Sequence, residues 1–129
     1  MTAVDTNVLV RLLTGDDPRQ CAAAKALFEA EPVWIAKTVL LETAWVLRRL
    51  YGFDDCALRD ALTKLLGLDN AHAEDEAAVA AAFRLAAGGV ELADAIHLTS
   101  RPPGAAFATF DRAFARLATR AGASGVSVI

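Results

Sequence analysis

The segment MTAVDTNVLVRLL, residues 1–13, passes from strand-forming residues through one acid into a helical apolar pattern. Residues 1–4 favour a short strand, and the apolar residues after Asp5 recur on one face of a helix. Aspartate at such a junction is a good helix N-cap. In a parallel α/β protein, the same position is the carboxyl end of a strand, where ligands usually bind. The segment therefore predicts a strand–acid–helix unit and makes Asp5 a candidate site residue.

Short apolar strands and longer amphipathic helices alternate along the rest of the chain. Further strands are predicted at residues 33–36, 105–110 and 126–129, with a short one between 67 and 73. Further helices are predicted to begin after the caps or acids Asp17, Thr38, Asp54, Glu74, Glu91 and Asp111. The alternation predicts an α/β sandwich with a central, mainly parallel sheet of about four to five short strands flanked by about seven helices.

The composition predicts one well-packed domain over residues 1–129. With 55% hydrophobic and 22% charged residues, the chain is far from the composition of disordered proteins. The two cysteines, Cys21 and Cys56, form no metal-binding pattern and are expected to be small buried residues. No apolar run is long enough for a membrane span, and an acid at position 5 is unlike a secretory signal. We therefore expect a cytoplasmic protein.

The net charge of −3 does not favour nucleic-acid binding, because phosphate contacts normally come from an excess of Lys and Arg. A local basic patch or a metal ion would have to compensate.

Four carboxylates stand out, and each also has a purely structural explanation. Asp5 and Asp111 both lie between a strand and a helix, where either could be only an N-cap. Glu42, within TVLLETAWVL, is costly to bury without a partner unless its face of the helix reaches solvent. Asp94 lies near the start of a short apolar helix, where the helix dipole favours an acid.

Convergence at one end of the sheet would explain all four acids together. Such a cluster repels itself, so it needs either raised pKa values or a hard cation. Carboxylate oxygens without nitrogen or sulfur ligands select Mg²⁺ or Mn²⁺. A carboxylate-held divalent ion can activate water and orient a phosphodiester, which is the logic of metal nucleases.

Four motifs occur in this order: DTNVLVR at residues 5–11, Glu42 in LLETAWVLRR, DAIH at 94–97 and TFDRAF at 109–114. With these motifs the chain resembles a PIN-domain ribonuclease of the VapC toxin type. The resemblance implies that Asp5, Glu42, Asp94 and Asp111 form an acidic pocket that holds Mg²⁺ or Mn²⁺. In that pocket a metal-activated water would cleave single-stranded or looped RNA, leaving a 5′-phosphate and a 3′-hydroxyl.

The same resemblance implies supporting residues and partners. Thr6, Asn7 and Thr109 match the polar positions that surround the acids in the family. A cognate VapB-type antitoxin would inhibit the pocket, and homodimers or toxin–antitoxin hetero-oligomers are usual.

A basic rim for RNA is predicted from Arg11, Arg48, Arg49 and Arg112, each near a pocket acid in sequence, although a solvated helix face explains any one of them. Trp45 could stack on bases, but core or dimer packing is the favoured interpretation. Two other functions stay open: a housekeeping RNA-processing nuclease and a non-catalytic protein-binding module. A phosphohydrolase with Asp5 as nucleophile is disfavoured, because position 7 is Asn rather than a second acid.

Overall fold

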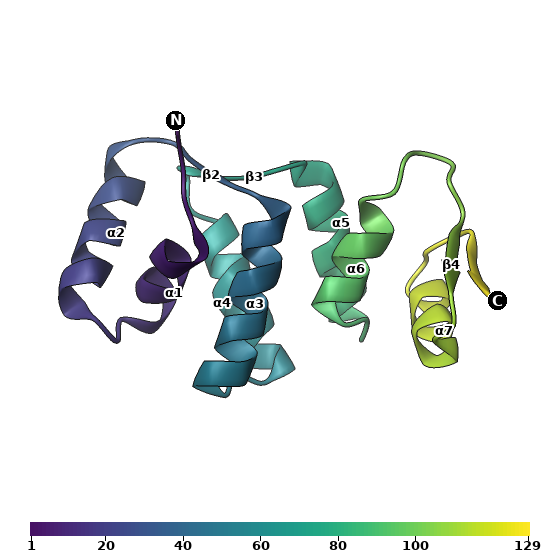
Figure 1. Ribbon diagram of the computed structural model, residues 1–129. Helices are drawn as coiled ribbons and strands as arrows, with labels where there is room; N and C mark the ends of the chain where they lie inside the picture. The colour runs from purple at the N-terminus through teal and green to yellow at the C-terminus, as the bar shows by residue number, and fades with distance from the viewer. The chain divides into compact units, whose positions relative to one another are not determined.

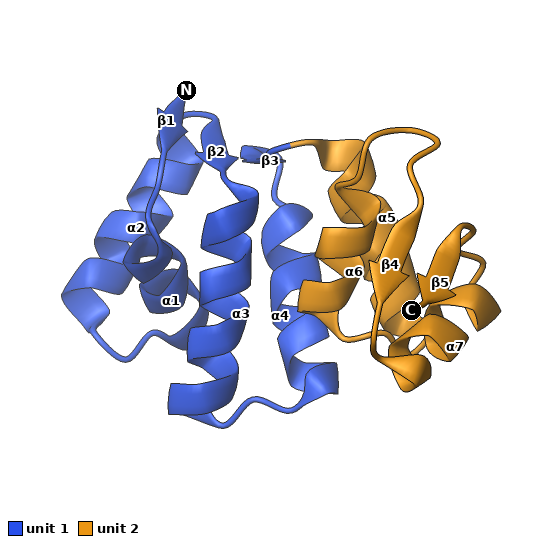
Figure 2. Ribbon diagram, turned by 45° about the vertical axis from the view of Figure 1, so that its right-hand side comes forward, with its two compact units in different colours: residues 1–74 blue, residues 75–129 orange.

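The computed structural model describes all residues 1–129 as seven helices and five short strands. They form two compact units, residues 1–74 and residues 75–129, which are described separately (Figures 1 and 2). All strand pairs are parallel, in one sheet of three strands and one of two. The predicted α/β class, the helix number and the parallel pairing are confirmed.

The sheet of unit 1 contains β1 (Thr2–Ala3), β2 (Val33–Ile35) and β3 (Ala71–Ala73), with β2 in the middle. Alternation along β2 places Val33 and Ile35 in the core with no exposed surface, while Trp34 is half-buried. Because the strands are parallel, their carboxyl ends lie at one edge of the sheet. The residues that follow each strand therefore share that edge.

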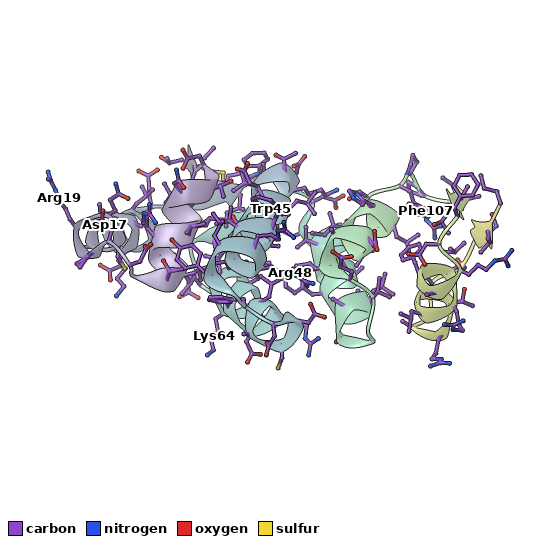
Figure 3. The ribbon with its side chains drawn as sticks, turned by 60° about the horizontal axis from the view of Figure 1, so that its bottom comes forward. Asp17, Arg19, Trp45, Arg48, Lys64 and Phe107 are labelled. Carbon is purple, nitrogen blue, oxygen red and sulfur yellow. The ribbon has the colours of Figure 1, made fainter.

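Four helices complete unit 1: α1 (Thr6–Thr14), α2 (Pro18–Ala30), α3 (Lys37–Tyr51) and α4 (Asp55–Leu66). Helix α1 packs against both α2 and α3 (Figure 1). Local sequence sets several boundaries, since Asp17 caps α2 ahead of Pro18, and Gly15 ends α1 with a left-handed φ of 64°. Asp17 and Arg19 lie at this start of α2 in Figure 3. Leucines from three of these helices build the core: Leu9, Leu40, Leu47, Leu58, Leu62 and Leu65.

The predicted cap of α3 is wrong. Thr38 lies inside the helix, which begins at Lys37 after Ala36, and Ala36 offers no side-chain hydrogen bond. Glu74 serves instead, because its Oε1 accepts from the backbone N–H of Lys37 at 2.9 Å. Glu74 itself is held by its own N–H, which donates to the carbonyl of Ile35 at 2.8 Å. A residue 37 positions away in sequence therefore accepts a hydrogen bond from the first N–H of α3.

Unit 2 contains the helices α5 (Glu76–Ala87), α6 (Leu92–Thr99) and α7 (Arg112–Arg120), with the paired strands β4 (Phe107–Thr109) and β5 (Val126–Val128). Helix α5 packs along α6, and α7 packs on β5 (Figure 2). The rings of Phe107 and Phe114, with centroids 5.7 Å apart, join β4 to α7; Phe107 is labelled in Figure 3. A Cβ at Gly88 would stand 3.1 Å from the Cβ of Ala121, so glycine allows the end of α5 to approach α7 closely.

The cysteine prediction is half right. Cys21 is buried on the inner face of α2, whereas Cys56 is exposed. Cys56 lies in the first turn of α4, away from the face formed by Leu58, Leu62 and Leu65. None of the helices combines the length and the apolar character needed to cross a membrane.

Candidate active site

Asp5 follows β1 at the carboxyl edge of the sheet and caps α1. Its backbone is extended, with φ −93° and ψ 176°, and its Oδ1 accepts from the N–H of Val8 at 3.3 Å. The side chain is exposed, and its second oxygen, Oδ2, has no hydrogen-bond partner. Capping therefore uses one carboxylate oxygen of Asp5 and leaves the other available.

Thr6 links Asp5 to Glu42. The side chain of Thr6 is buried, with 7% of the residue exposed, and its hydroxyl donates to Oε1 of Glu42. Glu42 lies on the solvent-facing side of α3, so the second of the two interpretations of this acid, a helix face that reaches water, is the one observed. The hydrogen bond holds the carboxylate of Glu42 against the residue next to Asp5. Asn7, the following residue, is exposed.

Glu74 is a further acid at this edge that sequence reasoning did not select. It follows β3 directly and, like Asp5, stands where a parallel strand ends. Its neighbours Asp75 and Glu76 made the segment resemble an ordinary acidic helix start. The signal that could have identified it was the short strand AHA immediately before it, but three residues give little periodicity.

Asp94 and Asp111 belong to unit 2. Asp94 lies in the first turn of α6, is half-buried and makes no hydrogen bond through its side chain. Asp111 is exposed and caps α7, with Oδ1 accepting from the N–H of Phe114 at 2.9 Å. Thr109, at the end of β4, accepts from the backbone N–H of Asp111 at 3.0 Å. Thr109 is therefore in contact with the backbone of Asp111.

The four candidate arginines fall into two pairs. Arg11 and Arg48 already serve carboxylates: Arg11 donates through Nη1 to both oxygens of Asp16 at 3.0 Å, and Arg48 pairs with Asp55. Arg49 and Arg112 are exposed and have no side-chain partner. The second pair is therefore the one with free guanidinium donors.

Arg11 and Asp16 belong to a polar network that ties α1 to α3. The hydroxyl of Tyr51 donates to Asp16 and accepts from Nη1 of Arg11 at 3.1 Å. The hydrogen bond from Tyr51, followed by those from Thr14 and Arg11, lowers the pKa of Asp16, although partial burial opposes the shift. The hydrogen bond with Tyr51, together with the charge of Asp16, raises the pKa of Arg11. These groups are therefore committed to structure.

The candidate acids, in contrast, carry no neutralising base. The ion pairs within unit 1 are Met1–Glu31, Arg11–Asp16 and Arg48–Asp55, and none of them includes a candidate acid. Within each unit taken alone, no group of three or more His, Cys, Asp or Glu side chains is arranged to hold a metal ion. Each unit thus supplies two of the four predicted carboxylates, all with at least one free oxygen. Such oxygens are the donors that hard divalent ions prefer.

Comparison with known proteins gives one family. The model of the PIN domain matches residues 2–120, which is nearly the whole chain and includes all four acids. No curated protein matches the sequence.

Proposed function

We propose, since this chain belongs to the PIN domain family, that it is a divalent-metal-dependent endoribonuclease whose acidic site is Asp5, Glu42, Asp94 and Asp111. PIN domains are generally metal-dependent nucleases, and the matched region contains every proposed acid. The observation that carries the proposal for this chain is the contact between Thr6 and Glu42, which holds an unneutralised carboxylate against the residue that follows Asp5. We further propose that residues 1–129 act as a single domain.

The chemistry of the donors fits a hard cation. Asp5 and Asp111 each use only Oδ1 for capping, and Asp94 has no hydrogen bond, so carboxylate oxygens remain for Mg²⁺ or Mn²⁺. When bound, such an ion would supply a water activated near neutral pH and a positive charge for the phosphodiester.

The protein's own residues prepare this site. The Thr6 hydroxyl orients Glu42, and Thr109 holds the backbone of Asp111 through a hydrogen bond at 3.0 Å. Thr6 and Thr109 would therefore orient the acids without binding the metal ion themselves, and such hydrogen bonds affect metal affinity. Asn7, the residue after Thr6, is exposed, and we propose that it also supports the acids.

We assign the nuclease to the VapC toxin type, acting in the cytoplasm. Support comes from DTNVLVR at residues 5–11, the glutamate in LLETAWVLRR, and DAIH and TFDRAF, in that order. A VapC-type toxin implies a VapB-type antitoxin as partner, and a homodimer or a toxin–antitoxin hetero-oligomer as the assembly. The alternative within the family is a housekeeping RNA-processing nuclease. A small antitoxin-like reading frame beside the gene would separate the two.

The test is cleavage of total cellular RNA by the purified protein. Wild type with Mg²⁺ or Mn²⁺ should give discrete fragments, and chelator should stop the cleavage. Asp94→Asn should be inactive, whereas Asp60→Asn, which changes an exposed and unpaired acid on α4, should cleave as wild type does. Equal cleavage by Asp94→Asn and Asp60→Asn would reject the assignment of Asp94.

A non-catalytic binding module is the second candidate, and the capping hydrogen bonds of Asp5 and Asp111 favour it. In that case the acids serve the fold alone. Asp5→Asn and Asp111→Asn, which keep an acceptor for the cap, would then leave the effect of the protein on growing cells unchanged. If the protein is a nuclease, both substitutions should abolish its effect on growing cells.

A further inference from the structure

Trp45 is a large apolar side chain that unit 1 does not use for its core. It is 58% exposed, while its sequence neighbours Thr43, Ala44 and Leu47 are all buried. Helix α3 is therefore anchored through a different face. Trp45 and Arg48 can both be followed on α3 in Figure 3. Of the two favoured interpretations of Trp45, packing in the core is thus wrong, whereas packing in a dimer stays a prediction.

The position of Trp45 on α3 relates it to the proposed site. At about 100° per residue, Glu42, Trp45 and Arg49 lie within a sector of about 60° on the helix. Along the axis, Trp45 stands about 4.5 Å beyond Glu42, and Arg49 about 10 Å beyond it. The exposed stripe of α3 thus carries a carboxylate, then an indole, then a guanidinium.

The guanidinium N–H donors of Arg49 are not paired with any side chain. Its neighbour Arg48 pairs with Asp55, whereas Arg49 has no side-chain partner. A place in the last turn of α3 favours both arginines through the helix dipole. This interaction with the dipole uses none of the N–H donors of Arg49, so its guanidinium remains available to bind an anion.

We infer that Trp45 is a stacking platform for one base of single-stranded RNA and that Arg49 contacts a phosphate further along the same strand. This inference rests on the proposed function for the identity of the strand. Aromatic side chains beside cationic groups are how proteins hold single strands without reading their sequence.

The surroundings of Trp45 favour RNA over a protein partner. A protein-docking face is a continuous apolar patch, usually with a polar rim. On α3, the other strongly exposed apolar residue is Leu50, 70% exposed, which lies about 140° around the helix from Trp45. A single indole between two charged side chains offers little area to a protein, but it matches a base and its flanking phosphate.

The test measures RNA binding without cleavage, in a parent protein that carries Asp94→Asn. The probe is a fluorescein-labelled single-stranded RNA of mixed sequence, titrated in the presence of Mn²⁺ and compared with its duplex. Trp45→Ala in this parent should weaken binding to the single strand about 5- to 150-fold, since stacking on one base contributes about 1–3 kcal/mol. Trp45→Phe should recover part of the affinity. The control Leu50→Ala removes an equally exposed apolar side chain on another face and should bind as the parent does.

Tryptophan fluorescence gives a second readout. The chain has two tryptophans, and only Trp45 is strongly exposed. RNA should quench the parent's fluorescence and leave the Trp45→Ala protein, which retains Trp34, almost unchanged.

The inference is overturned if the folded parent does not bind the single strand, or if Trp45→Ala and Leu50→Ala bind equally well. It is also overturned if Trp45→Ala keeps its RNA affinity but loses self-association by light scattering, since the indole then faces a second copy. A wrong assignment of the acidic site would give another result: the Asp94→Asn parent would cleave RNA as fast as wild type, while RNA binding would still depend on Trp45.

Discussion

The hydroxyl of Thr6 donates a hydrogen bond to Oε1 of Glu42, and this contact joins the first turn of α1 to the exposed face of α3. Thr6 is itself buried, so it cannot turn away from Glu42 without losing its place against the core. The residue before it, Asp5, follows β1 at the edge of the sheet and caps α1. Two acids that are far apart in sequence are thereby connected through one threonine.

Thr6→Ala should reduce RNA cleavage about 10- to 100-fold, the usual effect of removing a group that orients a metal-binding carboxylate. Thr6→Ser keeps the hydroxyl and should restore most of the activity. Circular dichroism should show the same helix content for both variants. If Thr6→Ala and Thr6→Ser cleave equally well, the hydroxyl does not position Glu42 for catalysis.

Substitutions at Asp5 separate its capping role from its proposed role at the site. Asp5→Asn keeps an oxygen that can accept from the N–H of Val8, so the free energy of unfolding should stay close to wild type. Asp5→Ala loses the cap and should cost about 1 kcal/mol. Both should abolish cleavage, because neither retains the charge. Urea unfolding and RNA cleavage, measured on the same preparations, check both expectations. An active Asp5→Asn protein would show that Asp5 is a helix cap and has no role in catalysis.

Glu74 should prove important for stability through the start of α3. Glu74→Ala removes the acceptor for the N–H of Lys37 and should lower the free energy of unfolding by about 1 kcal/mol. Glu74→Gln retains an acceptor oxygen and should lose less. The matched control is Glu29→Gln, an exposed acid on α2 with no hydrogen bond. A Glu74→Ala protein as stable as Glu29→Gln would contradict the capping role.

Tyr51 should make stability depend on pH through Asp16. The pKa of Asp16 lies below its ordinary value of 3.8 in the folded protein, chiefly because the Tyr51 hydroxyl donates to it. The ionised form is therefore favoured by folding, so this stabilisation is complete above the unfolded pKa and is lost as the pH falls through the folded pKa. Tyr51→Phe should lower the Tm near neutral pH, and the difference from wild type should shrink below about pH 4. Thermal unfolding across that range checks the sign; a constant difference would show that Tyr51 acts independently of Asp16.

Local signals in the sequence were enough for most element boundaries. Asp17 before Pro18, Gly15 after α1 and Asp54 before α4 each act within a few residues, so the chain near them determines the outcome. The cap of α3 was mispredicted because its acceptor, Glu74, arrives from the end of β3. No local pattern can indicate a partner so distant in sequence.

The candidate site was accessible to sequence reasoning only in part. Acids at strand ends can be recognised, and Asp5 and Asp111 are found there. Proximity in sequence could not reveal that Arg11 and Arg48 pair with Asp16 and Asp55, so the predicted arginine rim stays a prediction. Trp45 was expected in the core or in a dimer contact, because a large aromatic residue is usually packed; its 58% exposure excludes the core.

The central claim is that Asp5 and Asp94 are ligands of a divalent metal ion, and titration with Mn²⁺ followed by electron paramagnetic resonance tests it without relying on activity. Four proteins are compared: wild type, Asp5→Asn from unit 1, Asp94→Asn from unit 2, and the control Asp60→Asn. We predict that Asp5→Asn and Asp94→Asn each weaken the same Mn²⁺ binding event at least about tenfold, whereas Asp60→Asn binds as wild type does. Unchanged Mn²⁺ affinity in either Asp5→Asn or Asp94→Asn would contradict the proposed role of that acid in metal binding.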